Sequence, residues 1–417
     1  MEQRSERRNW HYEGTTSDPY FKRYAPACVI SVLPELSCAC AAQLHTGTAV
    51  RASPLLSTLP TLHNLHDKLA SIERKECEGK EFMAVFEDIV RDLATIPDYQ
   101  DSFEAADWLG KTVKLNVPGG KMARGKALVK AYKSLLPEQE QTPEKIRLSI
   151  VMALCVEMLQ SSFQIVDDMM DDSTVRKNRP CWHRVNDIGM VAANDAEIVE
   201  CAVYKILEKY FSDKPYYLDT LKSFHDITLK TVLGQALDVN VAAKYSGKVP
   251  DLCTYTMERY RVIVKYKTCY FTCCFPFALA MYMAGLNNEE LLRHGNNILM
   301  EIGQFVQAYD DYLDCFGDPA VTGKIGTDIE TRKCTWLIAT AMQRATPEQK
   351  AVLEDCYGIK DPLKVSAVKK IYEELDLHSA YAAFVQEKNE IINNLIDQLP
   401  QDLPKQLFYD LMCILRM

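Results

Sequence analysis

The sequence predicts an all-α fold, a bundle of long helices with its functional site between facing helices. From about residue 78 onward, apolar residues recur at helical spacing, for example at Phe82, Val85, Phe86 and Ile89. The chain has no sustained alternation of polar and apolar residues, and it lacks the dense Gly/Asn turns that mark β-hairpins. We therefore expect residues 78–417 to form one helical domain.

Each predicted helix is a periodic apolar stretch bounded by proline or glycine. Breaks fall at Pro118-Gly119-Gly120, Pro180, Pro215, Gly317 and Pro400, because proline lacks the N–H group of a helix interior and glycine weakens a helix. The predicted helices cover residues 81–94, 144–170, 195–211, 216–243, 254–285, 288–316, 333–344, 364–374 and 380–398.

Composition excludes some classes of function. The net charge of -9 argues against nucleic acid as the main partner. The hydrophobic fraction of 47% is ordinary for a globular protein, and no uninterrupted apolar run of about 18 residues suggests a membrane span. Few of the 15 cysteines have metal-ligand spacing, so we interpret most of them as reduced thiols in an intracellular compartment.

The N-terminal residues 1–77 read as a flexible extension. Residues 24–66 are rich in Ala, Ser, Thr, Leu and Pro and contain one acid, Glu35. The acids Glu2, Glu6 and Glu13 precede this stretch and weaken a transit-peptide interpretation. We expect a cytoplasmic protein, with a mitochondrial location as the alternative if residues 1–75 include a transit segment.

Two acidic motifs carry the strongest functional signal. The pattern D-D-x-x-D occurs at 167–171 and again at 310–314, each time at the end of an apolar helical stretch. Residues four apart on a helix share a face, so each motif gathers carboxylates, which are the ligands Mg²⁺ takes together with substrate phosphates. A single acidic run is more often a solvated helix face, but two copies with basic neighbours favour a metal–diphosphate site. The candidate metal ligands are Asp167, Asp168, Asp171, Asp310, Asp311 and Asp314.

Basic segments accompany both motifs. The loop at 117–125 contains two glycines and places Lys121 and Arg124 at the start of a helix, which makes a reasonable anion site. Residues 172–179 follow the first motif with Arg176, Lys177 and Arg179, which could grip phosphate or simply form surface ion pairs of little energy.

Three further lysines have positions suited to a diphosphate. Lys267 lies in the middle of an apolar helical stretch, where it must find an anion or reach solvent. Lys324 sits in a glycine-containing loop after the second motif, and Lys333 follows it. Near a metal-bound diphosphate these lysines would neutralise the charge of the leaving group.

Taken in order, these motifs resemble the short-chain trans-isoprenyl diphosphate synthases, most closely the eukaryotic farnesyl diphosphate synthases. The likeness runs from about residue 80 to residue 415. It is carried by N-V-P-G-G-K at 116–121, V-E-M-L-Q at 156–160, both acidic motifs, C-W at 181–182, G-Q at 234–235, K-Y-K-T at 265–268, V-T-G-K-I-G-T-D at 321–328 and Y-E-E-L-D-L at 372–377.

The resemblance implies an isoprenoid synthase fold, a homodimer and an allylic prenyl diphosphate held by three Mg²⁺ ions per active site. It places Lys267, Thr268, Gln307 and Lys324 at the reacting end of that substrate. It implies diphosphate binding by Lys121, Arg124, Gln160, Arg176, Lys177 and Lys333.

The half of the site that binds isopentenyl diphosphate, the nucleophile, departs from the family pattern. Ala123 stands where the family has Asn, Lys177 and Asn178 stand for Arg-Gly, and Tyr309 stands for Gln. The exchange of Arg for Lys gives up bidentate phosphate binding. The C-terminal end, I-L-R-M, also differs from the basic tail of the family.

A further departure concerns the cavity for the prenyl chain. The family usually places two aromatic residues before the first acidic motif, and here they read Ser162 and Phe163. Serine in place of a ring would deepen the pocket, with local repacking as the alternative. The third residue assigned to the cavity is Tyr309.

These departures favour an enzyme that ionises a ready-made prenyl diphosphate, so the chain looks like the insect terpene synthases derived from this family. We expect it to convert farnesyl diphosphate to a sesquiterpene hydrocarbon or alcohol with release of diphosphate. One alternative is a prenyltransferase that condenses isopentenyl diphosphate with an allylic diphosphate to form farnesyl or geranyl diphosphate. The other is a non-catalytic subunit, against which the two intact acidic motifs argue.

Overall fold

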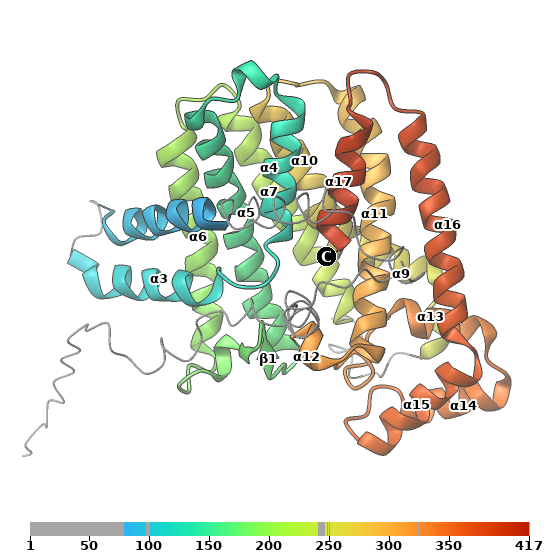
Figure 1. The fold of residues 1–417 in the computed structure, drawn as a ribbon. Coiled ribbons are helices and arrows are strands. Elements are labelled where there is room, and N and C mark those ends of the chain that lie inside the picture. Colours follow the sequence, from blue (N-terminus) through green and yellow to red (C-terminus); the bar gives the residue numbers. More distant parts are fainter. Residues whose placement is uncertain are drawn as a thin grey trace, which may run out of the picture. The chain divides into compact units, whose positions relative to one another are not determined.

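Two long helices bring the acidic motifs into the bundle. Helix α5 (Pro143–Met170) ends in the first motif, and α11 (Glu289–Phe316) holds the second in its last turns (Figure 1). The computed structural model describes residues 79–96, 101–240, 247, 249, 251–323 and 325–416. The predicted extension over residues 1–77 lies outside the described residues, as does Lys324. The all-α prediction is confirmed, because the described strands amount to one short hairpin.

The remaining helices and strands follow these bounds. The first half contains a helix at residues 79–94, α3 (Phe103–Asn116), α4 (Ala123–Leu135), the 3₁₀ turn η3 (Glu138–Glu140), the strands β1 (Val175–Arg176) and β2 (Arg179–Pro180), η4 (Trp182–Arg184), α6 (Val191–Phe211) and α7 (Tyr217–Asp238). The second half contains η5 (Leu252–Thr254), α9 (Met257–Val264), η6 (Lys265–Cys274), α10 (Phe275–Met283), α12 (Pro319–Thr322), α13 (Trp336–Arg344), α14 (Pro347–Cys356), α15 (Pro362–Glu374), α16 (Leu377–Asp397) and α17 (Lys405–Arg416).

Helix α5 begins with a side-chain cap and runs through the core. The Thr142 hydroxyl accepts a hydrogen bond from the Lys145 N–H, and Pro143 occupies the first turn, where a missing N–H costs nothing. Every residue from Ile150 to Leu159 is buried. Each large apolar side chain buried there stabilises the fold by about 1.5–3 kcal/mol. Helices α4 and α6 pack directly against α5.

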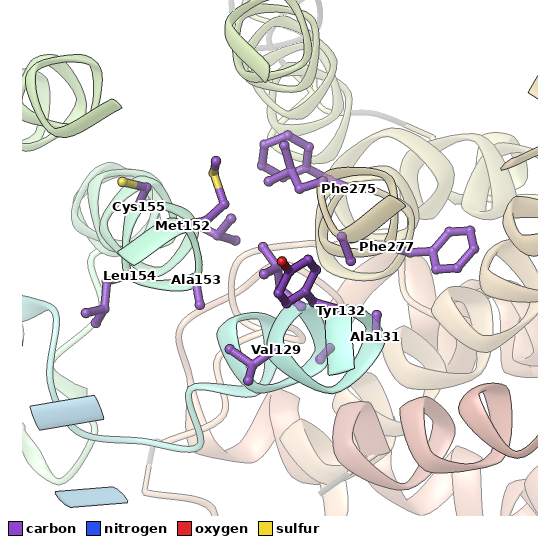
Figure 2. Packing of buried hydrophobic residues seen from close by; sticks show 14 of the residues in the cluster. Val129, Ala131, Tyr132, Met152, Ala153, Leu154, Cys155, Phe275 and Phe277 are labelled. Atoms are coloured by element: carbon purple, nitrogen blue, oxygen red, sulfur yellow. The ribbon is translucent and has the colours of Figure 1, made fainter. Parts of the chain in front are cut away.

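Figure 2 shows this core at close range. The ring of Tyr132 from α4 points into the space that Met152 of α5 and Phe275 of α10 also fill. All three side chains are buried, with exposed fractions of 4% or less. A second core lies around α13, α14 and α15, where Trp336 and Leu353 are among the buried residues. Helix α11 contributes residues to both of these cores, and a third, smaller cluster surrounds Ile165 and Trp182.

Among the described helices, α5 alone has the length and composition of a membrane span. By length and composition it is apolar enough to cross a membrane, with a mean hydropathy of 1.5 over its best stretch. Within the protein, 78% of that stretch is buried. A core helix passes the same test of length and composition, and the burial of α5 is that of a core helix.

The predicted helix over 254–285 is divided into three continuous segments. Between α9 and α10, η6 is a π-helix of ten residues, and its geometry continues to the Phe275 N–H, which bonds to the Tyr270 carbonyl five residues earlier. Pro276 follows at once and has no N–H to offer the preceding turn, which favours a local departure from α-helical bonding. Such π-helical segments are frequent at functional sites, and this one contains Lys267 and Thr268.

Two glycines allow helices on either side to approach η6 closely. A Cβ atom on Gly234 of α7 would lie 2.3 Å from the Lys267 backbone nitrogen. A Cβ atom on Gly303 of α11 would lie 2.8 Å from the Cys269 Cα. Only glycine fits at these contacts, so η6 is held between α7 and α11 at backbone distance.

The sequence analysis missed several helices. Helices α3, α4, α14 and α17 lie outside the predicted ranges, although α4 follows the basic loop that was expected to lead into a helix. The short stretch before α14 contains a complete capping box between Thr346 and Gln349, which is a local signal for that helix. The hairpin β1–β2 was also missed.

Gly234→Ala should destabilise the protein. The added methyl group meets backbone atoms of η6 that cannot rotate away, so we expect the free energy of unfolding to fall by about 3 kcal/mol. Urea-induced unfolding followed by circular dichroism measures this. Gly110→Ala in α3 is the matched control, because its Cβ meets one carbon at 3.9 Å and alanine favours the helix. Equal stability of the two variants would contradict the close packing.

Candidate active site

The first acidic motif is bound by side chains from three other segments, two of them cations. Arg176 of β1 donates hydrogen bonds to Asp168, with 3.0 Å between its Nε and the carboxylate oxygen. Asp167 accepts hydrogen bonds from Lys267 Nζ at 3.2 Å and from Gln235 Nε2 of α7 at 2.8 Å. The hairpin, α7 and η6 thus meet at the C-terminal end of α5.

Asp238 joins two of the predicted lysines. This residue ends α7 and accepts hydrogen bonds from Lys267 Nζ at 2.5 Å and from Lys333 Nζ at 2.7 Å. Lys333 also forms an ion pair with Asp171 at 2.9 Å. The side chains of Asp238 and Lys333 are 9% and 7% exposed, so water screens this pairing weakly.

The pKa values follow from burial and pairing together. Burial alone would raise the pKa of Asp167 and of Asp238, but the ammonium groups of Lys267 and Lys333 hold both pKa values below the usual range. Burial would lower the pKa of Lys267, and its carboxylate partners raise it well above normal instead. The pKa of Asp171 is raised, chiefly by burial. The network is therefore charged at neutral pH.

The second acidic motif is linked to the first through the residue after Lys267. The hydroxyl of Thr268 donates to Gln307 Oε1 at 2.5 Å, and Gln307 Nε2 donates to Asp311 at 2.8 Å. The other Asp311 oxygen accepts the backbone N–H of Trp336 at 2.8 Å. Burial raises the pKa of Asp311 to about 7. Of two consecutive residues of η6, Lys267 thus bonds directly to the first acidic motif and Thr268 is linked to the second through Gln307.

The other carboxylates of the second motif lie toward the basic segments. Asp310 is exposed at its position on α11, and its charge raises the pKa of Arg176. The Asp314 carboxylate accepts the backbone N–H of Asp328 at 3.1 Å. Tyr309 is half-buried beside Asp310.

Lys177 and Asn178 form the turn of the β1–β2 hairpin. Both have positive φ angles, 52° and 59°, as a two-residue type I′ turn requires. Asparagine tolerates this left-handed backbone better than most residues, so Asn178 preserves the turn that a glycine would make. The Asn178 N–H donates to the Gly323 carbonyl at 3.2 Å, which ties the hairpin to the loop after α12 (Figure 1).

The hairpin turn also brings Lys177 to the basic loop. Lys177 Nζ donates to the carbonyls of Asn116 and Val117, at 2.8 Å and 3.3 Å. Its side chain passes over Gly119 and Gly120, at 3.6 Å from where their Cβ atoms would stand. Burial lowers the pKa of Lys177 to about 8. The structure therefore brings Lys177 and the loop at 117–121 together, as the sequence suggested.

Arg124 lies deeper in the same region. Its guanidinium donates to the Thr272 hydroxyl of η6 at 2.8 Å and lies 5.2 Å from the centre of the Phe271 ring. One turn of α4 is fixed nearby, because Glu157 accepts the Gly125 N–H at 2.7 Å. Of the other two predicted binding residues, Lys121 is exposed in the loop and Gln160 is half-buried on α5.

The predicted cavity residues are packed against the helices. Ser162 is 2% exposed and its hydroxyl donates to the Leu159 carbonyl at 2.8 Å. Phe163 meets Phe271 edge to face, with ring centres 5.3 Å apart. The deeper pocket expected from Ser162 stays a prediction, as does its alternative of local repacking.

Three residues of the site were missed from the sequence. Asp238 and Gln235 contact the predicted lysine and aspartate, and Glu157 anchors α4. Gln235 was noted only as part of a matching string. The sequence did contain a signal for Asp238. It lies three residues after Gln235 in an apolar helical stretch, and residues three apart share one face of a helix. Within the described residues, no three or more Asp, Glu, His or Cys side chains form a preassembled metal cluster.

Asp238→Asn should destabilise the protein by about 3 kcal/mol, because it removes one charge from a buried network and leaves two ammonium groups short of a counter-charge. Thermal and urea unfolding measure the change. Asp226→Asn is the control on the same helix, since Asp226 pairs with Lys230 at the surface and such pairs contribute about 0–1 kcal/mol. Similar losses from the two variants would mean that the buried network adds no more than a surface pair.

Comparison with known proteins gives a consistent set of relatives. A farnesyl pyrophosphate synthase of Murgantia histrionica is 44% identical over 336 residues, which cover 80% of this chain and 81% of that protein. A farnesyl pyrophosphate synthase of Gallus gallus is 39% identical over 88% of this chain and 98% of its own length. Among solved structures, a T. brucei farnesyl diphosphate synthase complexed with risedronate matches with a TM-score of 0.73 and 29% identity, over 81% of this chain and 97% of that one.

These relatives correct the functional expectation drawn from the sequence. The expected terpene synthase is wrong, because the matching proteins are farnesyl pyrophosphate synthases at 37–44% identity over most of the chain. The error came from treating Lys177 and Asn178 as losses, although the hairpin turn and its contact with the basic loop are kept. The model of the polyprenyl synthetase family matches residues 106–375, and the chain belongs to this family of prenyltransferases.

Proposed function

We propose that the protein condenses isopentenyl diphosphate with an allylic diphosphate to form farnesyl diphosphate. The observation that carries this proposal is the pair Lys267 and Thr268: Lys267 bonds to the first acidic motif, and Thr268 is linked to the second through Gln307. Similarity to farnesyl pyrophosphate synthases over most of the chain supports the same reaction.

In the proposed reaction the C1–O bond of the allylic diphosphate breaks and its electron pair leaves with the diphosphate. The double bond of isopentenyl diphosphate attacks C1 to form the new C–C bond, and a proton then passes from the new chain to an oxygen of the released diphosphate, which restores a double bond. Lys267, Lys333 and Arg176 bind the departing diphosphate and stabilise its charge. The Thr268 hydroxyl is fixed by Gln307 at the reacting end, and the buried wall behind it excludes water from the cation.

The site has the donor chemistry that Mg²⁺ requires. Its carboxylates are hard oxygen ligands at the ends of two rigid helices. Both oxygens of Asp168 and of Asp311 are engaged by protein donors, so we assign these two residues to orienting the site. We assign Mg²⁺ binding to Asp167, Asp171, Asp310 and Asp314, because they supply carboxylate oxygens from both acidic motifs. When bound, the metal neutralises diphosphate charge and so assists cleavage of the C–O bond. The number of three Mg²⁺ ions per active site remains a prediction.

The second diphosphate, that of isopentenyl diphosphate, is assigned to the basic loop and the hairpin. Lys121, Arg124 and Lys177 supply the cations, and the glycines of the loop permit close backbone approach. Gln160 lies on α5 between this region and the first acidic motif.

We also propose that the protein is a homodimer. Helix α7 exposes Leu229, Val232, Leu233 and Leu237, with exposed fractions of 41–60%, at the spacing of one helix face. The opposite face holds Gly234 against η6, so this stripe is free to meet a second copy. Leu229→Asp with Leu233→Asp should convert the dimer to a monomer in analytical ultracentrifugation, and a monomeric wild-type protein would contradict the proposal.

The proposed reaction predicts a product, and it predicts different kinetic defects for variants of the two halves of the site. With Mg²⁺, geranyl diphosphate and isopentenyl diphosphate should yield farnesyl diphosphate, measured by chromatography of the dephosphorylated products. Asp167→Ala should reduce kcat by on the order of 10³ or more, because it removes an acidic ligand and a partner of Lys267. Lys121→Ala should mainly raise the KM for isopentenyl diphosphate, by on the order of tenfold. Lys126→Ala is the control, because Lys126 is also exposed and lies in the first turn of α4, just after the loop.

A volatile hydrocarbon from farnesyl diphosphate alone, with no longer prenyl diphosphate from the paired substrates, would overturn the proposed condensation. Equal effects of Lys121→Ala on the KM of both substrates would overturn the assignment of the basic loop to isopentenyl diphosphate.

Lys177 predicts a pH dependence. Burial lowers the pKa of Lys177 to about 8, so its ammonium group is present below that pH and is lost as pH rises through it. The kcat/KM for isopentenyl diphosphate should therefore fall above about pH 8, since kcat/KM reports groups of the free enzyme. Lys177→Arg stays charged over this range and should remove the decline. A parallel decline in both proteins would exclude Lys177 as its source.

A further inference from the structure

A cavity of about 280 Å³ lies behind the second acidic motif, between α9, α13 and α16. Its lining includes Tyr260, Arg261, Trp336, Thr340 and Arg344, and Phe384 closes one side. Of these residues only Trp336 contacts the candidate active site, through its backbone N–H, and the proposed reaction gives the cavity no role. Its volume suits a small organic molecule better than a prenyl chain.

The wall of the cavity combines aromatic rings with one unsatisfied hydroxyl. The rings of Trp336 and Phe384 lie 5.3 Å apart at an angle of 46°, which forms an apolar corner for a flat group. Thr340 is 5% exposed, and its hydroxyl oxygen has no hydrogen-bond partner among the described residues. A buried hydroxyl without a partner costs free energy, which a ligand in the cavity would recover.

The rim supplies positive charge. Arg261 and Arg344 are exposed, and neither forms an ion pair with another residue in the described part of the chain. The one acid that lines the cavity is Glu387, so the lining carries a net positive charge. Guanidinium groups bind planar oxyanions through two parallel hydrogen bonds. The chemistry therefore favours an organic anion with a flat apolar group.

The cavity shares its wall with the active site. The backbone N–H of Trp336 is the donor that holds Asp311, and the Trp336 ring contacts Tyr381, which stacks on Tyr312 at 4.4 Å. Tyr312 is the residue that follows Asp311 in the second motif. Tyr260 lies on the other side, close enough to Asp311 that burial and this carboxylate together raise the pKa of its phenol. A ligand against Trp336 thus contacts the residue that positions Asp311.

We propose that this cavity is a regulatory site for a small organic phosphate or carboxylate with a flat apolar group, and that occupancy changes the affinity of the active site for the allylic diphosphate. The second part rests on the proposed function, while the binding itself does not. Arg261 and Arg344 bind the oxyanion, Thr340 donates its hydroxyl, and Trp336 and Phe384 contact the apolar group.

Binding is tested on the full chain by calorimetry, with phenyl phosphate as the probe and benzoate and inorganic phosphate as further arms. Phenyl phosphate should bind saturably and change the tryptophan fluorescence, and Trp336→Phe should remove most of that change while heat of binding persists. Arg261→Ala with Arg344→Ala should weaken binding by on the order of tenfold or more, and Thr340→Val by several-fold. Arg293→Ala is the control, because Arg293 pairs with Glu290 elsewhere on the surface.

The benzoate arm separates a carboxylate ligand from a phosphate ligand. If inorganic phosphate binds as tightly as phenyl phosphate, or if the arginine pair has no effect, the anion occupies other cations and the site is overturned. Absence of saturable binding by both organic anions overturns it as well. All these outcomes are read without any catalytic assay, so they stand even if prenyl transfer is not found.

Coupling is tested in a second experiment. Saturating phenyl phosphate should change the KM for the allylic diphosphate in the wild-type protein by several-fold, and it should have no effect on the Arg261→Ala, Arg344→Ala protein. Without the ligand, the two proteins should have the same KM and kcat, because the arginines lie outside the active site. An unchanged KM despite measured binding would overturn the coupling, and an unchanged response in the arginine variant would place the effect elsewhere.

Discussion

The approach of α7 and α11 to the two sides of η6 is the constraint on which the site depends. Gly234 and Gly303 let both helices reach the backbone of η6, so Lys267 and Thr268 stand between the two acidic motifs. The π-helical geometry of this segment presents the two side chains to different partners, one carboxylate network each. Helix ends supply the carboxylates, and close packing supplies their relative positions.

Charge balance is the second requirement of the site. Burying a carboxylate without a partner costs several kcal/mol, and here Asp167, Asp171 and Asp238 share Lys267 and Lys333. Asp238 adds negative charge at the C-terminal end of α7, where the helix dipole already opposes it, so the two lysines also offset that cost. The lysines that we assign to diphosphate binding are thus held in place by carboxylates before substrate arrives.

Much of the fold and of the site could be predicted, and the failures have physical causes. The spacing of apolar residues located α5 and α11, and D-D-x-x-D located both motifs, because each is a local pattern. Asp238 could not be recognised as a site residue from the sequence, because its role depends on contacts with lysines that are 29 and 95 residues away in sequence. The terpene-synthase hypothesis failed because residue identity at 177 and 178 was considered without the backbone, whose left-handed turn accepts asparagine.

The two glycines also limit how this site can change through evolution. Glycine has the smallest side chain, so every substitution at Gly234 or Gly303 adds atoms where the backbones touch. These two positions therefore cannot accept another residue without a shift of the helices. The departures from the family pattern at Ala123, Lys177 and Tyr309 all lie outside these glycine contacts. New specificity can therefore arise by exchange around the rim while the central scaffold stays unaltered.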